Sequence, residues 1–125
     1  GNLFVFDFNE KSPVAKNLQQ LKAHKNERVI SIHYCEQTGV VYSTSKDNYI
    51  NMYNFDKSGE LQKVSSIKEE DLNIIYNIHQ SKLFPEKLVI LGFYGNFAYV
   101  WNKQDNMQIF SIDCKGGNRP IRLKV

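Results

Sequence analysis

The 125-residue sequence lacks any apolar run approaching the roughly 18 residues that a membrane-spanning helix needs. Its first residues, GNLFVFDFNEKS, lack the basic segment and the long apolar segment of a secretory signal. Cysteine is scarce, since only Cys35 and Cys114 are present, so the sequence indicates no disulfide framework. We therefore expect a soluble, unexported protein with reduced thiols in the cytoplasm and no contact with a membrane.

A large excess of charge is also missing. The chain has 16 Lys and Arg against 13 Asp and Glu, and the resulting net charge of +3 is too small to indicate a nucleic-acid-binding protein by itself. Hydrophobic residues make up 42% and charged residues 23%, which is typical of a folded domain and not of a disordered tail. A hydrophobic core is expected.

An aromatic landmark recurs along the chain. Phe6, Tyr53 and Trp101 each lie in a strand-like segment and are followed by a polar residue, and they are separated by 47 and 48 residues. This period is close to the ~40–45 residues of a WD repeat and the ~50 of a kelch repeat, each of which forms one four-stranded propeller blade. The period therefore indicates a propeller.

Short alternating apolar segments bounded by turn residues predict strands between these landmarks, and helical patterns are hard to find. The predicted strands cover residues 28–34, 40–45, 49–55 and 60–67 in one unit and 72–79, 88–93, 97–102 and 107–113 in the next. We predict an all-β fold, namely a segment of a WD40-type β-propeller with about two complete four-stranded blades plus flanking strands.

The predicted segment divides into a blade end at 1–22, blades at 23–67 and 68–113, and the start of a further blade at 114–125. Because two blades cannot close a ring, the remaining blades are expected from a longer chain. A single β-barrel or sandwich of about eight to ten strands is the alternative that this length allows.

The unit at 23–67 carries a histidine before its first strand, serines in its second, an aspartate in the next turn and an aromatic residue in its third. These residues are His24, Ser43 or Ser45, Asp47 and Tyr53. The pattern resembles WD-repeat proteins, and the resemblance implies a buried hydrogen-bonded network that holds the turn in place. A catalytic Ser-His-Asp triad is the alternative, and it is disfavoured because the repeat already accounts for the spacing.

The next unit lacks this pattern. Gly95 stands where Asp47 stands in the first unit, and no histidine precedes the strand that begins near residue 72. We expect this unit to have lost the network.

The stretch YVWNKQDNMQIFSIDCKGGNRPIRL at 99–123 resembles the WD-repeat accessory subunits of tRNA 2′-O-ribose methyltransferases. The matching residues are Cys114, Gly116, Gly117, Asn118 and Arg119. The resemblance implies a non-catalytic scaffold without a cofactor or an S-adenosylmethionine pocket. Such a scaffold binds a separate catalytic methyltransferase subunit and helps to position tRNA for methylation of the wobble ribose. A generic WD40 protein-interaction module with unrelated partners is the alternative.

Two places are candidate contacts for RNA or a partner. Residues 115–125 contain four basic residues and no acidic side chain. The other 12 of the 16 basic residues and all 13 acidic residues lie in residues 1–114, so the excess positive charge is in this end of the sequence. In this basic end, Lys115, Asn118 and Arg119 are candidates for phosphate contact, and a solvated turn is the alternative. Tyr94, in the loop GFYGN, is a candidate partner anchor, with packing as its alternative.

Other chemistry has little support in the sequence. His33 and Cys35 share one face of a strand, but no second pair completes a metal site. Neither Cys35 nor Cys114 has a partner base that spacing reveals, and the acidic segment 68–72 is typical of a solvated loop. We therefore expect no metal, no cofactor and no enzymatic activity.

Overall fold

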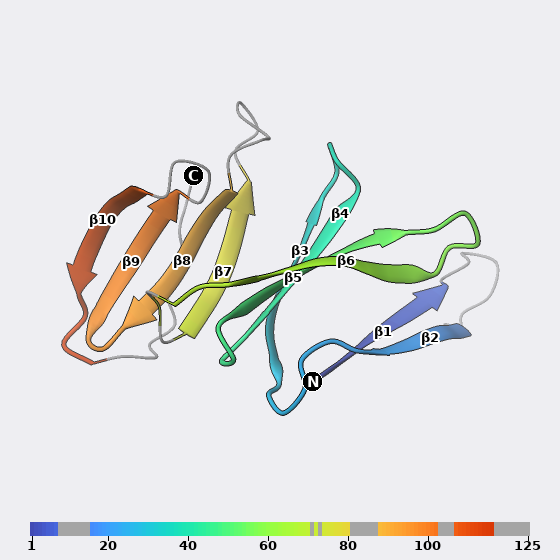
Figure 1. The fold of residues 1–125 in the computed structure, drawn as a ribbon, viewed down its shortest axis with the longest axis horizontal. Helices are drawn as coiled ribbons and strands as arrows, with labels where there is room; N and C mark the ends of the chain where they lie inside the picture. The colour runs from blue at the N-terminus through green and yellow to red at the C-terminus, as the bar shows by residue number, and fades with distance from the viewer. Residues whose placement is uncertain (8–15, 71, 73, 81–87, 103–106, 117–125) are drawn as a thin grey trace.

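In the computed structural model, the described residues are 1–7, 16–70, 72, 74–80, 88–102 and 107–116. They form ten strands in three antiparallel sheets, one with two strands and two with four (Figure 1). The described part of the chain contains no helix, so it also has none that is long and apolar enough to cross a membrane.

The first sheet is a hairpin of β1 (Asn2–Asp7) and β2 (Lys16–Lys22). β1 consists of alternating aliphatic and aromatic residues, whereas β2, KNLQQLK, is mostly polar. Leu3 and Val5 on β1 and Leu21 on β2 belong to one apolar cluster, so one face of the hairpin packs on the rest of the molecule. The polar character of β2 explains why the apolar pattern did not predict it as a separate strand.

The second sheet contains four strands paired in chain order: β3 (Val29–Cys35), β4 (Val40–Ser45), β5 (Tyr49–Phe55) and β6 (Leu61–Lys68). A tight turn joins β3 to β4, where the N–H of Gly39 donates to the carbonyl of Cys35 at 2.8 Å. Gly39 has a φ of +71°, a conformation that glycine adopts without the strain that a side chain would cause.

The third sheet repeats this order with β7 (Ile74–Gln80), β8 (Leu88–Tyr94), β9 (Phe97–Asn102) and β10 (Met107–Asp113). Two sequential four-stranded antiparallel sheets are the arrangement of WD40-type propeller blades. The prediction of an all-β propeller segment is confirmed, with strand ends that differ from the predicted ones by at most two residues.

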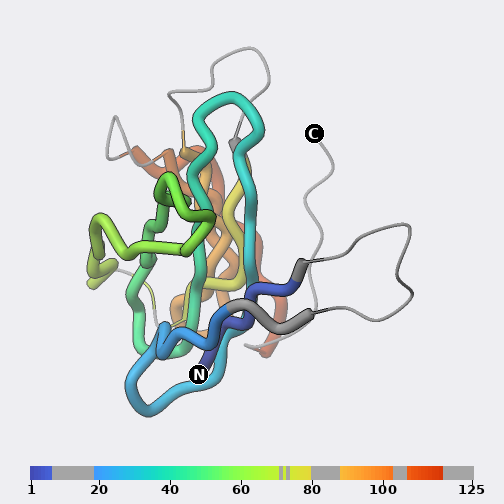
Figure 2. Tube along the Cα trace, turned by 90° about the vertical axis from the view of Figure 1, so that its right-hand side faces the viewer, coloured from blue at the N-terminus to red at the C-terminus, as the bar shows by residue number. Residues whose placement is uncertain are grey.

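The second sheet lies between the hairpin and the third sheet (Figures 1 and 2). One apolar cluster fills the space toward the third sheet and includes Tyr42, Ile50 and Ile90. Another fills the space toward the hairpin and includes Leu3 and Tyr53. Because each cluster is built from two sheets, the sheets support one another through their faces, as neighbouring blades do.

The three aromatic landmarks occupy the same place in their strands. Phe6, Tyr53 and Trp101 are each the fifth residue of β1, β5 and β9. Tyr53 faces the hairpin and is fully buried, Trp101 packs against the cluster shared with the second sheet, and Phe6 is 55% exposed. A landmark residue is thus buried where another described sheet covers its face of the strand, and exposed where none does.

Candidate functional site

A buried hydrogen-bonded network joins the loop before β3 to the second sheet. His24 Nδ1 lies 2.8 Å from Asp47 Oδ2, and His24 Nε2 lies 2.9 Å from the hydroxyl of Ser43. The Ser43 hydroxyl is 3.3 Å from that of Tyr53. His24, Ser43 and Tyr53 are at most 1% exposed, so the network lies inside the molecule.

The turn between β4 and β5 presents Asp47 to the histidine. The Asp47 Oδ1 accepts the backbone N–H of Tyr49 at 3.0 Å, and Asn48 has a φ of +64°, which asparagine tolerates better than most residues. The Ser45 hydroxyl accepts the backbone N–H of Asp47 at 3.4 Å. Of the two candidate serines, Ser43 therefore contacts His24, and Ser45 supports the turn.

Asn51 is a further member that the sequence analysis missed. Its Nδ2 donates to the carbonyl of Ala23 at 2.7 Å, and its Oδ1 accepts the hydroxyl of Ser66 at 2.6 Å. The side chain thereby links the His24 loop to β5 and β6. The signal for it was a polar residue inside the aromatic strand YINMYNF, at a position that alternation places on the same face as Tyr53.

The order Asp47, His24, Ser43 has the connectivity of a catalytic triad, but its surroundings differ. Ser43 is 0% exposed, and its hydroxyl is engaged by both His24 and Tyr53. Burial raises the pKa of the Tyr53 phenol, while hydrogen bonds to Ser43 and Asn51 act in the opposite direction, so the phenol keeps its proton. The arrangement holds a turn, and no substrate reaches the serine oxygen in this conformation.

The third sheet has an apolar contact at the corresponding place. Ser43 pairs with Asn51, the third residue of β5, and Gly92 pairs with Tyr99, the third residue of β9. Where Ser43 meets His24, Gly92 meets the side chain of Leu72. A leucine over a glycine thus stands in place of the histidine and the serine.

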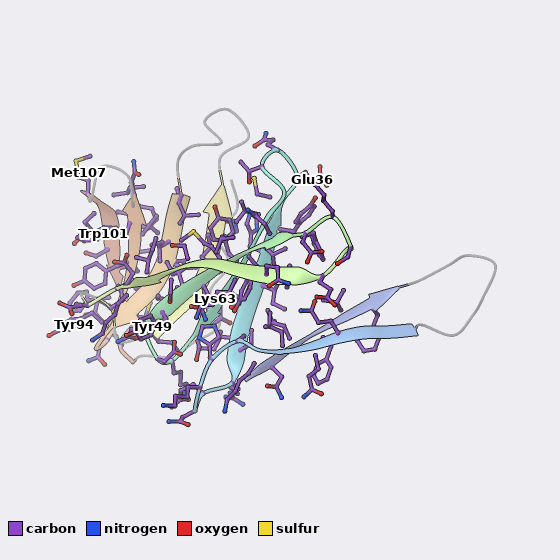
Figure 3. All side chains as sticks on the ribbon, turned by 45° about the vertical axis from the view of Figure 1, so that its right-hand side comes forward. Glu36, Tyr49, Lys63, Tyr94, Trp101 and Met107 are labelled. Carbon is purple, nitrogen blue, oxygen red and sulfur yellow. The ribbon has the colours of Figure 1, made fainter. Side chains whose placement is uncertain are left out.

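The described candidates for partner or RNA contact lie at one end of the third sheet. Tyr94 ends β8 and is 54% exposed. Figure 3 shows it at the edge of the molecule. Tyr94 pairs with Phe97, which pairs with Asp113 of β10. The N–H of Lys115 donates to Asp113 Oδ1 at 2.8 Å, so the exposed Lys115 lies at the same end of the sheet.

The rest of the predicted basic end, including Asn118, Arg119, Arg122 and Lys124, lies outside the described residues.

The remaining candidates of the sequence analysis do not gather into a site. His33 and Cys35 lie on β3, where Cys35 is buried and the His33 ring centre is 6.2 Å from that of Tyr42. Among the described residues, no three His, Cys, Asp or Glu side chains are grouped so that they could hold a metal ion. Cys35 and Cys114 are free thiols.

Comparison with known proteins adds one relative. No protein-family model matches the sequence. The chain is 30% identical over 83 residues to the human tRNA (34-2'-O)-methyltransferase regulator WDR6. The match covers 65% of this chain and spans 7% of the length of the human protein. Together with the two four-stranded sheets, this match fits a segment of a WD-repeat protein and supports a role in protein interaction.

Proposed function

We propose that the chain is a non-catalytic WD-repeat scaffold. In this proposal it is part of an accessory subunit that binds a tRNA 2′-O-methyltransferase and helps to position tRNA for methylation in the anticodon loop. The observation that carries the proposal is the similarity to a human protein whose name describes it as a regulator of tRNA (34-2'-O)-methyltransferase. The structure supports the scaffold part of the proposal, because Asp47, His24 and Ser43 bond to one another in an internal network.

Neighbouring blades from a longer chain are part of this proposal. The hairpin covers Val41 and Tyr53 on one face of the second sheet, but Ile32 and Tyr34 of β3 remain 59% and 53% exposed. Ile32 pairs with Ser43, and Tyr34 pairs with Val41. Directly paired residues of neighbouring strands point to the same face, so Ile32 and Tyr34 lie on the face of the sheet that carries Val41. Two further strands beside β1 would cover this exposed apolar area, as a complete preceding blade does in a propeller.

A cytoplasmic location is also proposed, because the free thiols of Cys35 and Cys114 suit a reducing compartment.

The first experiment asks whether the chain associates with a methyltransferase. We expect the tagged protein to co-purify with the catalytic 2′-O-methyltransferase of its own organism, and its deletion to lower ribose methylation at the wobble position of tRNA. Methyl transfer by the purified chain alone would contradict the scaffold role. Unchanged tRNA methylation, with capture of unrelated proteins only, would favour a generic WD40 interaction module.

The exposed end of the third sheet can be tested in the same assay. Tyr94→Ala and Lys115→Ala should weaken co-purification without lowering thermal stability, since both side chains are exposed. Val64→Ala and Lys57→Ala are the controls, because Val64 is 56% exposed on β6 and Lys57 lies in the turn between β5 and β6. Equal weakening by the two pairs would argue against a contact at this end.

A further inference from the structure

A pocket of about 320 Å³ opens beside the His24 network, between the end of β2 and the strands β5 and β6. Three lysines from separate parts of the chain line it: Lys22 ends β2, Lys25 follows His24 in the loop, and Lys63 lies on β6. Figure 3 shows Lys63 together with Tyr49, which also lines the pocket. The fold therefore brings together a basic site that no continuous sequence motif predicts.

The positive charge of this pocket is not neutralised within the described structure. None of the three ammonium groups lies within salt-bridge distance of a carboxylate among the described residues, whose ion pairs are His24–Asp47 and Lys68–Glu70. Asp47 is the one carboxylate among the described lining residues. Its oxygens are occupied by His24 Nδ1 at 2.8 Å and by the N–H of Tyr49 at 3.0 Å.

The wall and floor of the pocket are held in place. Asn51 bonds to the Ala23 carbonyl at 2.7 Å and to the Ser66 hydroxyl at 2.6 Å, which ties the loop bearing Lys25 to the strands. Tyr49 is 39% exposed at the edge of the pocket and presents an aromatic ring beside the cations. Lysines beside an exposed aromatic ring are the combination that holds phosphates and stacks a base in single-stranded nucleic acid.

The third sheet offers a comparison within the same molecule. Its corresponding pocket, of about 420 Å³, is lined by Glu70, Tyr94, Trp101 and Gln108 and, among the described residues, by no basic side chain. The lysines are thus a property of one blade and not of the repeat. A general role in holding blades together would not require them.

We propose that Lys22, Lys25 and Lys63 form a binding site for neighbouring phosphate groups of a single-stranded segment of RNA, with Tyr49 stacked on a base. This proposal rests on the RNA-positioning part of the proposed function and adds the surface that performs it. The phosphate contacts supply affinity without sequence preference, and the aromatic contact orients the strand.

The experiment measures binding of a short fluorescein-labelled oligouridine to the whole 125-residue chain by fluorescence anisotropy, over a series of sodium chloride concentrations. The triple variant Lys22→Gln, Lys25→Gln, Lys63→Gln should reduce the slope of log Kd against log salt by about two, since each lost phosphate contact on a single strand removes about 0.7. Tyr49→Ala should weaken binding by about fivefold or more. Circular dichroism checks that each variant remains folded.

The matched control is the triple variant Arg28→Gln, Lys46→Gln, Lys57→Gln, which removes the same charge from exposed positions outside the pocket. It should leave the salt slope nearly unchanged. An equal decrease of the salt slope in both triple variants would show that the pocket is not the RNA-binding site. It would leave the RNA-positioning part of the proposed function standing. Absence of RNA binding by the unmodified chain would overturn both, but would leave association with the methyltransferase standing. Stronger competition by a phosphoserine peptide than by unlabelled oligouridine of equal charge would overturn the site as one for RNA.

Discussion

The side chain of Leu72 occupies the space over Gly92. A Cβ built on Gly92 would lie 2.6 Å from Leu72 Cδ1 and 2.7 Å from the carbonyl oxygen of Ile74. At the corresponding place of the second sheet, Ser43 bonds to His24. The two blades thus hold their loops by different means, one with hydrogen bonds and the other with an apolar contact.

Gly92→Ala should lower the free energy of unfolding by about 1–3 kcal/mol, because the added methyl group overlaps both a side chain and the backbone. Urea denaturation measures the change. Gly59→Ala is the control, since nothing lies within 4 Å of its Cβ position and its cost comes from a φ of +83° alone. The double variant Leu72→Ala, Gly92→Ala should not regain the full free energy of unfolding, because the Ile74 carbonyl still overlaps the added methyl group. Complete recovery would show that Leu72 alone restricts the site.

Residue patterns predicted the fold more completely than the sites. Alternation and a period of 47 to 48 residues were sufficient for the four-stranded units, because strands and turns are local features. The Leu72 contact and the role of Asn51 depend on register across strands, which composition does not show. The lysine pocket joins Lys22 and Lys25 to Lys63 on another strand, so only the folded chain reveals it.

Asp47→Ala should cost about 1–3 kcal/mol of stability, because it leaves a buried His24 nitrogen without its partner. Ser45→Ala is the matched control on β4. Ser45 is 0% exposed, whereas the Asp47 side chain is 23% exposed, but the Ser45 hydroxyl accepts only a 3.4 Å bond from a backbone N–H, so its loss should cost less. Thermal and urea unfolding of both variants measure the difference. Equal effects would show that the network contributes little beyond the turn itself.

The loss of stability on replacing each of the three aromatic landmarks by alanine should increase with the burial of its side chain. Tyr53→Ala should cost about 3–5 kcal/mol, because the ring is fully buried between the hairpin and the second sheet. Trp101→Ala should cost less, and Phe6→Ala, at a 55% exposed position, less than about 1 kcal/mol. Chemical denaturation of the three variants gives the ranking. A large loss for Phe6→Ala would mean that β1 is covered on its outer face in solution.

Two histidines lie on the strands by which the second and third sheets face each other. His33 lies on β3 and His79 on β7, two strands that pack against each other. Burial lowers the pKa of His33, and the charge of His79 lowers it further, while burial alone lowers the pKa of His79. Among the described residues, His79 Nε2 is buried without a hydrogen-bond partner. Both effects favour the neutral form of the rings.

Stability should fall as the pH drops below about 6.5, because both histidines take up protons more readily in the unfolded chain than in the folded one. Above that pH both states are neutral at these positions, so the pair has no effect there. The loss develops from about pH 6.5 downward through the lowered pKa values. The double variant His33→Gln, His79→Gln should show a smaller decrease in melting temperature between about pH 7 and pH 5.5, a range above the usual titration of carboxylates. An unchanged decrease in the double variant would assign the pH dependence to other groups and show that the two rings are not held neutral at the contact between the sheets.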